Sequence, residues 1–159
     1  MNADRELRAE VVVDAPPKQV WAAITDLKEL AKDSPELVTM LPLKRGGLRQ
    51  NQWYLGINRR KGVVWPTRNV VAVFEPLKTL AWDTKTSGAR WIFELAPEGT
   101  GTRLTHRRPV PKRLTVLGKV FAIGFLGGKE EHADELEVGM RTTLDGIKAA
   151  AERPAGSTL

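Results

Sequence analysis

Residues 90–110, which read RWIFELAPEGTGTRLTHRRPV, decide the fold that the sequence predicts. From Arg90 to Ala96 apolar and charged residues alternate, which is the period of a β-strand with one face turned to a core. Pro97 to Gly101 supplies the proline and glycines of a turn. The period of two returns from Thr102 to Val110 and predicts a second strand there. Two strands joined by so short a turn are expected to pair antiparallel.

The same period of two continues upstream of this stretch, with short turns of glycine, proline and lysine between the apolar runs. Further strands are predicted at Leu7 to Val13, Leu37 to Lys44, Gln52 to Arg59, Val63 to Phe74 and Thr79 to Lys85. Because the turns are short, the strands are expected to form an antiparallel meander and not βαβ crossovers.

Helical spacing flanks the strands on both sides. Pro17 to Leu27 carries apolar residues three and four apart, and Leu27 to Lys32 predicts a second short helix that stops before Pro35. The last third of the chain predicts a long amphipathic helix. Its apolar stripe consists of Leu136, Met140, Leu144, Ile147 and Ala151.

The stretch from Leu114 to Gly128 is apolar and rich in glycine, and it admits two interpretations. It is either a mobile flap at a cavity mouth that contacts a membrane transiently, or the buried first half of the long helix. It is too short for the roughly 20 residues that span a bilayer. The glycine pair Gly127-Gly128 predicts a break before the amphipathic helix.

Composition places the chain among ordinary globular proteins. Its 159 residues, 42% hydrophobic and 28% charged, fit one domain over residues 1–153 with a frayed tail over 154–159. The absence of cysteine excludes a disulfide framework, a thiolate metal site and a cysteine nucleophile. The first residues lack the apolar segment of a secretory signal, so a cytoplasmic location is predicted.

The net charge of +6 would attract nucleic acid or anionic lipid. The basic residues are spread along the chain near turns and strand ends, however, so a solvated surface is the favoured interpretation and no nucleic-acid partner is expected. A basic surface module that binds nucleic acid or membrane is therefore the least favoured of the three functions considered for this chain.

Six short sequence motifs, taken in their order along the chain, resemble those of a known family. The strings are Val13 to Trp21, Phe74 to Pro76, Leu80 to Trp82, Trp91 to Leu95, Gly101 to Thr105 and Gly139 to Leu144. Together they extend over residues 6–150 or so, and they resemble the START-like SRPBCC superfamily, in particular its polyketide cyclase/dehydrase and lipid-transport branch.

The resemblance implies an α+β helix-grip fold, in which a curved antiparallel sheet wraps a long C-terminal helix, with two short helices after the first strand. Members of the superfamily hold lipids, polyketides, sterols, hormones or quinones in a cavity, and some catalyse cyclisation, dehydration or hydrolysis. These strings are mostly fold motifs, so the resemblance supports the fold more strongly than it supports a particular activity.

Aromatic and polar residues on the strands are the candidate ligand-binding residues. Alternation places Trp91, Phe93 and Leu95 on one face of their strand, and Leu104, His106 and Arg108 on the inward face of the next. The full candidate set is Trp53, Trp65, Trp82, Trp91, Phe93, His106, Arg108 and Met140. Plain core packing is the competing interpretation for the tryptophans, and which faces of the Trp53 and Trp65 strands point inward is open.

His106 and His132 are the candidate acid/base residues, and Arg108 is a candidate partner for a carboxylate or enolate oxygen. The competing interpretations are a histidine satisfied by backbone, an arginine at an exposed strand end and an exposed helical histidine. The histidines lack the carboxylate spacing of a metal site, so no metal is predicted. No phosphate loop or dinucleotide fingerprint is present, so no cofactor is predicted either.

Two functions therefore lead. The first is binding of an apolar or polycyclic small molecule, lipid or polyketide-like, in an internal cavity. The alternative is an enzyme of the polyketide cyclase or dehydratase type, with a cavity histidine as acid/base. The residues alone leave this choice open.

Overall fold

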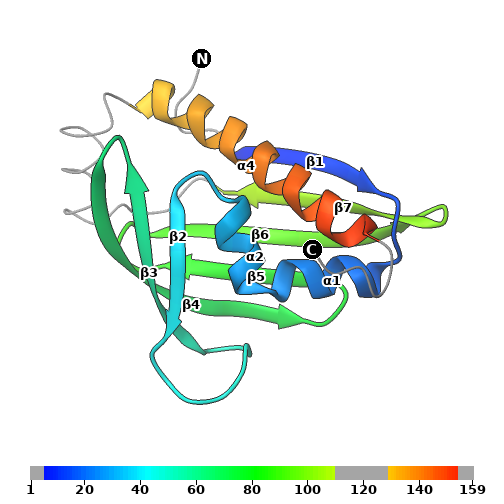
Figure 1. Ribbon diagram of the computed structural model, residues 1–159, viewed down its shortest axis with the longest axis horizontal. Helices are drawn as coiled ribbons and strands as arrows, with labels where there is room; N and C mark the ends of the chain where they lie inside the picture. The colour runs from blue at the N-terminus through cyan, green and yellow to red at the C-terminus, as the bar shows by residue number, and fades with distance from the viewer. Residues whose placement is uncertain (1–5, 110–128, 154–159) are drawn as a thin grey trace.

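The strands and helices follow the predicted order along the chain (Figure 1). The computed structural model describes residues 6–109 and 129–153, and the backbone alone of 129–133. Its strands are β1 (Leu7–Val13), β2 (Leu37–Pro42), β3 (Trp53–Arg60), β4 (Val63–Glu75), β5 (Thr79–Thr84), β6 (Ala89–Glu98) and β7 (Gly101–Arg108). Its helices are α1 (Pro17–Thr25), α2 (Leu27–Asp33) and α4 (Lys129–Glu152).

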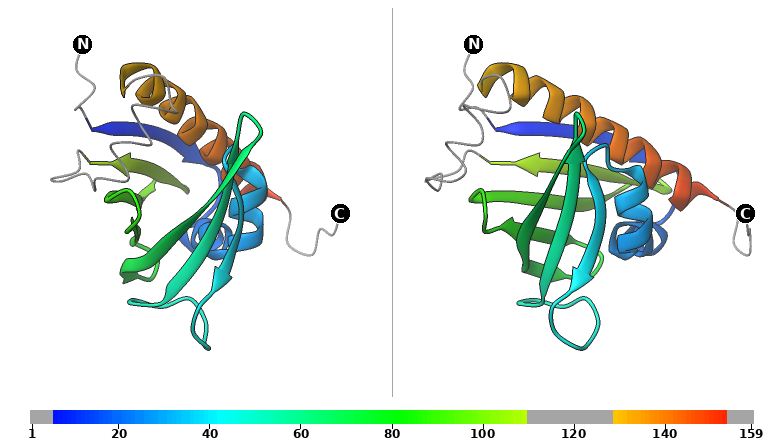
Figure 2. Two further views of the ribbon diagram at one scale, coloured as in Figure 1. Left: turned by 90° about the vertical axis from the view of Figure 1, so that its left-hand side faces the viewer. Right: turned by 60° about the vertical axis from the view of Figure 1, so that its left-hand side comes forward.

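In the described residues, seven strands form one antiparallel sheet in the order β1-β7-β6-β5-β4-β3-β2. The sheet curves around α4, and α1 and α2 lie beside the C-terminal half of that helix (Figures 1 and 2). The predicted α+β helix-grip fold is confirmed. The bounds of the predicted strands agree with the observed ones to within two residues.

Local sequence explains the turns that set the register. Lys61 and Gly62 join β3 to β4 and have positive φ angles of 52° and 81°. Two successive residues with positive φ make a type I′ turn, whose twist matches that of the paired strands. The β6–β7 hairpin of the opening stretch places Phe93 opposite His106 and Leu95 opposite Leu104.

The core lies between the sheet and α4. Four of the five residues of the predicted α4 stripe, Met140, Leu144, Ile147 and Ala151, are at most 6% exposed, and Leu136 is partly buried. The stripe belongs to one apolar cluster that includes residues of β1, α1 and the central strands. Burial of a side chain as large as Met140, Leu144 or Ile147 stabilises the fold by about 1.5–3 kcal/mol. Helix α4 is described from Lys129 onward, and the predicted break at Gly127-Gly128 lies outside the described residues.

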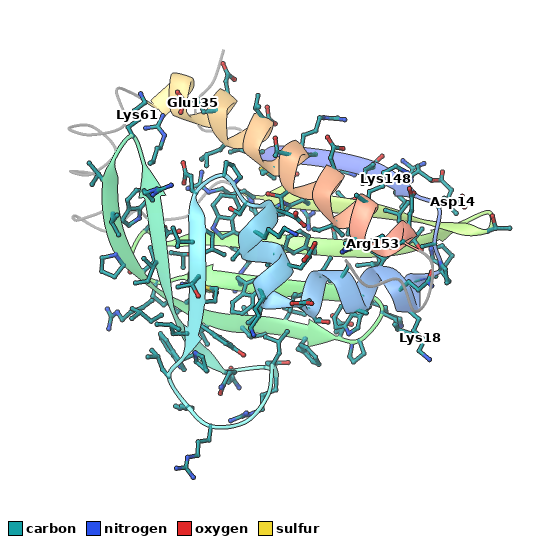
Figure 3. The ribbon with its side chains drawn as sticks, in the orientation of Figure 1. Asp14, Lys18, Lys61, Glu135, Lys148 and Arg153 are labelled. Carbon is teal, nitrogen blue, oxygen red and sulfur yellow. The ribbon has the colours of Figure 1, made fainter. Side chains whose placement is uncertain are left out.

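Polar contacts attach α4 to the rest of the fold near both of its ends, where Figure 3 labels Glu135 and Lys148. Near the start of the helix, the guanidinium of Arg60 donates to Glu135. Toward the end, Lys148 Nζ donates to the carbonyl oxygen of Val12 at 2.9 Å. The helix is therefore held against the β3–β4 hairpin and against β1.

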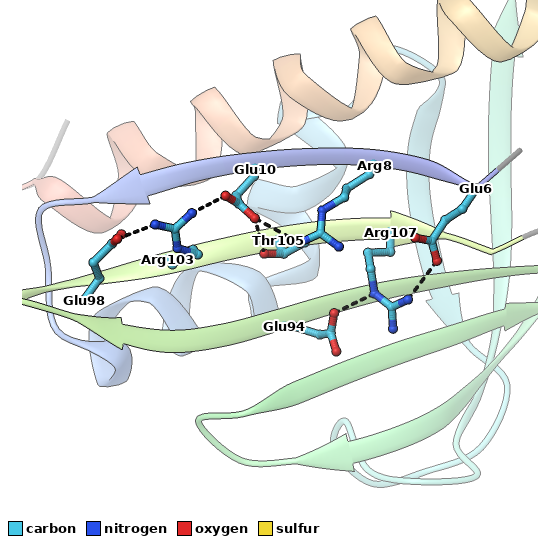
Figure 4. A network of polar contacts seen from close by, with 8 residues as sticks. All are labelled: Glu6, Arg8, Glu10, Glu94, Glu98, Arg103, Thr105 and Arg107. Carbon is cyan, nitrogen blue, oxygen red and sulfur yellow. Dashed lines mark hydrogen bonds and ion pairs between the residues drawn. The ribbon is translucent and has the colours of Figure 1, made fainter.

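The outer face of β1, β7 and β6 carries a charged network (Figure 4). Arg103 donates to Glu10 and to Glu98. Arg107 donates to Glu94 at 2.6 Å and to Glu6 at 2.8 Å. Because side chains alternate along a strand, these outward arginines fix Leu104, His106 and Arg108 on the inner face.

No helix in the described part of the chain is long and apolar enough to cross a membrane. The stretch from Leu114 to Gly128, predicted to be a flap or a membrane contact, lies outside the described residues, as does the predicted tail over 154–159.

Candidate functional site

The inner face of β7 presents Leu104, His106 and Arg108, as the alternation predicts. His106 is 6% exposed and stacks on Phe93, with ring centroids 4.0 Å apart and an interplanar angle of 17°. The ring of Trp91 lies on the same side, with its centroid 5.8 Å from that of His106. Neighbouring strands thus place three flat rings together.

His106 is a buried polar group within these apolar rings. Neither Nδ1 nor Nε2 has a hydrogen-bond partner among the described residues. Burial lowers the pKa of His106 to about 3, so the imidazole is neutral at neutral pH. A neutral imidazole offers one N–H donor and one acceptor, and buried groups of this kind are normally paired.

Arg108 lies one inner-face position further along β7. Its Cζ atom is 5.0 Å from the centroid of Trp91, which is the distance of a cation–π contact. Its buried Nε has no hydrogen-bond partner in residues 6–109 or 129–153. Burial lowers the pKa of Arg108, and the carboxylate of Glu36 opposes that shift.

We call Glu36, Arg60, Arg108 and Glu135 the charged end. Arg60 has a side chain only 8% exposed and forms ion pairs with Glu135 and with Glu36, the latter with Nε and Oε1 3.6 Å apart. Its buried Nη1 lacks a hydrogen-bond partner among the described residues. Burial raises the pKa of Glu36, whereas Arg60 and Arg108 act to lower it. The ends of β3 and β7, the residue before β2 and the start of α4 therefore bring four charged side chains together.

A row of polar side chains crosses the inner face of β3, β4 and β5. Thr67 Oγ1 accepts from Asn58 Nδ2 at 3.0 Å and from Asn69 Nδ2 at 3.1 Å. Thr84 Oγ1 donates to Asn69 Oδ1 at 2.8 Å. Gly56 leaves room for them, because a Cβ there would lie 2.6 Å from Thr67 Oγ1. The sequence interpretation missed this row. The signal that could have found it was a polar residue at alternate positions of the predicted strands, on the face that otherwise carries apolar residues.

The tryptophans divide between the two faces of the sheet. Trp82 is 5% exposed and lies edge-on to Tyr54, with centroids 5.3 Å apart. Trp65 pairs with Asn58 and so shares the inner face. Trp53 precedes the buried Tyr54 on β3, and alternation turns it to the outer face. The structure therefore does not bring Trp53 together with the other candidates.

The two candidates on α4 differ in position. Met140 is 2% exposed and belongs to the core cluster, so it forms part of the floor beneath the sheet. His132 belongs to the first turns of the helix, but its side chain lies outside the described residues. Among the described side chains, no group of three or more histidine, aspartate or glutamate residues is placed to hold a metal ion.

A hollow of about 270 Å³ lies elsewhere, where α1 and α2 meet the C-terminal half of α4. Its lining includes Asp26, Glu29 and Arg153, and Arg153 donates to Glu29 at 3.2 Å. It is separate from the charged end, which lies at the start of α4. We do not assign the candidate site to it.

The sequence comparison decides the family. Residues 4–152 match the family model described as polyketide cyclase/dehydrase and lipid transport. The chain belongs to this family. The resemblance seen in the six strings is thereby confirmed. No curated protein matches the chain closely enough in sequence to count as a relative.

Solved structures with the same fold have low sequence identity to this family member. TTHA0849 from Thermus thermophilus is 20% identical, with a TM-score of 0.67 over 92% of this chain and 96% of that one. CV1439 from Chromobacterium violaceum is 17% identical, with a TM-score of 0.68 over 94% and 99%. The di-domain ARO/CYC StfQ from the steffimycin biosynthetic pathway is 16% identical, with a TM-score of 0.70 over 96% of this chain and 52% of that one. These likenesses show that the chain shares its fold with the three structures.

Proposed function

We propose that this protein binds an apolar or polycyclic small molecule, lipid or polyketide-like, between the inner face of the sheet and α4. The single observation that carries the proposal is the pair of unpartnered nitrogens on buried His106, set among Phe93 and Trp91. Small-molecule sites combine mostly apolar walls with a few polar groups that fix orientation. A ligand oxygen beside His106 would supply the missing hydrogen bond.

Other inner-face groups support the same proposal. Trp82 Nε1 is buried and has no hydrogen-bond partner in the part of the chain that the structure describes. The row of Asn58, Thr67, Asn69 and Thr84 adds further polar groups on the same face. An amphipathic guest would find apolar rings and a limited number of donors and acceptors on one surface.

A reaction of the cyclase or dehydratase type is the second candidate, and Glu36 is the observation in its favour. Burial raises the pKa of this carboxyl, which is the direction expected of a general acid, whereas Arg60 and Arg108 act to lower it. His106, with its low pKa, would orient a ligand carbonyl and not act as a general acid. Unchanged turnover of a true substrate by Glu36→Gln and by His106→Gln would eliminate this candidate.

The binding proposal can be tested with two tryptophans on opposite faces. The full chain is purified from its own host, and native mass spectrometry is expected to show an added mass that organic solvent releases. Trp91→Ala is expected to lose that added mass, whereas Trp53→Ala is the matched outer-face control and is expected to keep it. Absence of any added mass, together with no binding of the neutral apolar dye Nile red, contradicts the proposal.

A further inference from the structure

We propose that Arg108 and His106 together form a subsite for the carboxylate of an apolar acid, such as a long-chain fatty acid, whose hydrocarbon part lies along the inner face of the sheet. The inference rests on the function proposed above, because it names the chemical class of the apolar ligand.

The geometry of β7 brings the two side chains to one place. His106 and Arg108 are two residues apart on the same strand, and alternation points both to the inner face. Both also lie against Trp91, whose centroid is 5.8 Å from the ring of His106 and 5.0 Å from Cζ of Arg108. Their polar atoms therefore border a common volume next to one aromatic wall.

The chemistry of the unpartnered atoms selects an anion. The buried Nε of Arg108 has no acceptor among the described residues. A guanidinium presents its N–H groups as a planar fork that matches the two oxygens of a carboxylate. The neutral imidazole of His106 adds one more donor. An alcohol or an ester would leave the buried charge of Arg108 uncompensated.

The other residues of the charged end favour a ligand with one negative charge over a ligand with two. Arg60 is already paired with Glu36 and Glu135, so it adds little positive charge for a ligand. The carboxyl of Glu36 also interacts with Arg108 through space. A phosphate dianion would meet repulsion from Glu36 that a carboxylate monoanion meets at about half the strength. The site therefore fits a fatty-acid type of ligand better than a phospholipid headgroup.

The experiment separates apolar binding from head-group recognition. Nile red is first bound to the full chain at pH 8. Dodecanoate, dodecanol and dodecyl phosphate are then titrated in separately, each below its aggregation concentration, and the displacement of the dye is measured. Dodecanoate is expected to displace the dye at a concentration about tenfold or more below that of dodecanol, as a charge-assisted pair predicts. Dodecyl phosphate is expected to be weaker than dodecanoate.

Variants locate the recognition on β7. Arg108→Met is expected to weaken dodecanoate about tenfold or more while dodecanol stays within about twofold. Arg107→Met is the matched control on the same strand, because its side chain points outward to Glu94 and Glu6, and it is expected to change neither ligand. Glu36→Gln is expected to tighten dodecanoate. Arg108→Lys, which keeps the charge and loses the fork, should fall between wild type and Arg108→Met.

Three outcomes would overturn the inference without touching apolar binding. They are equal displacement by dodecanoate and dodecanol in the wild type, stronger displacement by dodecyl phosphate than by dodecanoate, and an Arg108→Met variant that keeps the preference. The wild-type comparison decides the matter even if Arg108→Met fails to fold. Failure of Nile red and of all three ligands to bind would instead overturn the proposed function itself.

Discussion

The imidazole of His106 lies parallel to the phenyl ring of Phe93, 4.0 Å away, because β6 and β7 pair these two residues directly. Cross-strand neighbours stand face to face on a sheet, and two flat rings fill that space by stacking. The stack places a titratable group in an apolar setting, and it makes the stability of the fold depend on pH.

Acid is expected to destabilise the protein through His106. Its pKa is about 3 in the fold and near 6.5 in the unfolded chain, so the unfolded state binds more protons between these values. Stability from this group is present above pH 6.5 and is lost as the pH falls toward 3, by up to about 4–5 kcal/mol in total. The measurement is the free energy of unfolding by urea at pH 7, 6, 5 and 4.

His106→Gln provides the control for that pH series, because it removes the imidazole and leaves every carboxyl in place. The difference between wild type and variant isolates the histidine. We expect the wild type to lose more stability than the variant on going from pH 7 to pH 4. Parallel curves for the two proteins would show that His106 does not remain neutral in the fold.

Phe93→Ala is expected to destabilise the fold by about 3–5 kcal/mol, because the ring is 3% exposed and supports His106. Val12→Ala is the control on a nearby strand, since Val12 is 47% exposed, and it is expected to change stability by less than about 1 kcal/mol. Chemical denaturation of both variants tests this. A similar loss of unfolding free energy in the two variants would contradict the packing of the Phe93 ring in the core.

Gly146→Ala is expected to destabilise the protein although alanine favours helices. A Cβ at Gly146 would lie 2.3 Å from Cγ and 2.7 Å from Cβ of Asp33, and because side-chain rotation does not move Asp33 Cβ, α4 and α2 must separate. Such overpacking costs about 1–3 kcal/mol, which exceeds the gain of up to about 1 kcal/mol from helix propensity. Gly47→Ala is the control, because nothing lies within 4 Å of its added Cβ. A Tm for Gly146→Ala at or above the wild-type value contradicts the close contact.

Breaking one outer-face ion pair is expected to matter less than removing one buried hydrogen bond. Arg103→Met removes solvent-exposed ion pairs with Glu10 and Glu98, and because water screens such pairs the loss of stability should be small. Thr102→Val leaves the carbonyl of Ala15 without its 2.8 Å partner and is expected to cost about 1–3 kcal/mol. The unfolding free energies of the two variants should therefore rank in that order, and the reverse ranking would contradict it.

The period of the sequence predicted the strands and the inner-face position of His106 and Arg108, because Leu104 sets the phase of β7. It could not decide Trp53, since both faces of β3 carry apolar residues and only the pairing of Tyr54 with Asn69 fixes the orientation. The ion pairs of Arg60 were missed for a different reason. They join the end of β3 to the start of β2 and to α4, and no local pattern encodes such distant contacts.

The position of β1 has a consequence for the way the chain folds. Its only partner strand in the described sheet is β7, with Val13 opposite Thr102 and Leu7 opposite Arg108. A chain emerging from the ribosome therefore holds its first strand unpaired until the last one has been made. Closing so long a loop is entropically costly, and we expect the joining of β1 to β7 to be a late and slow event in folding.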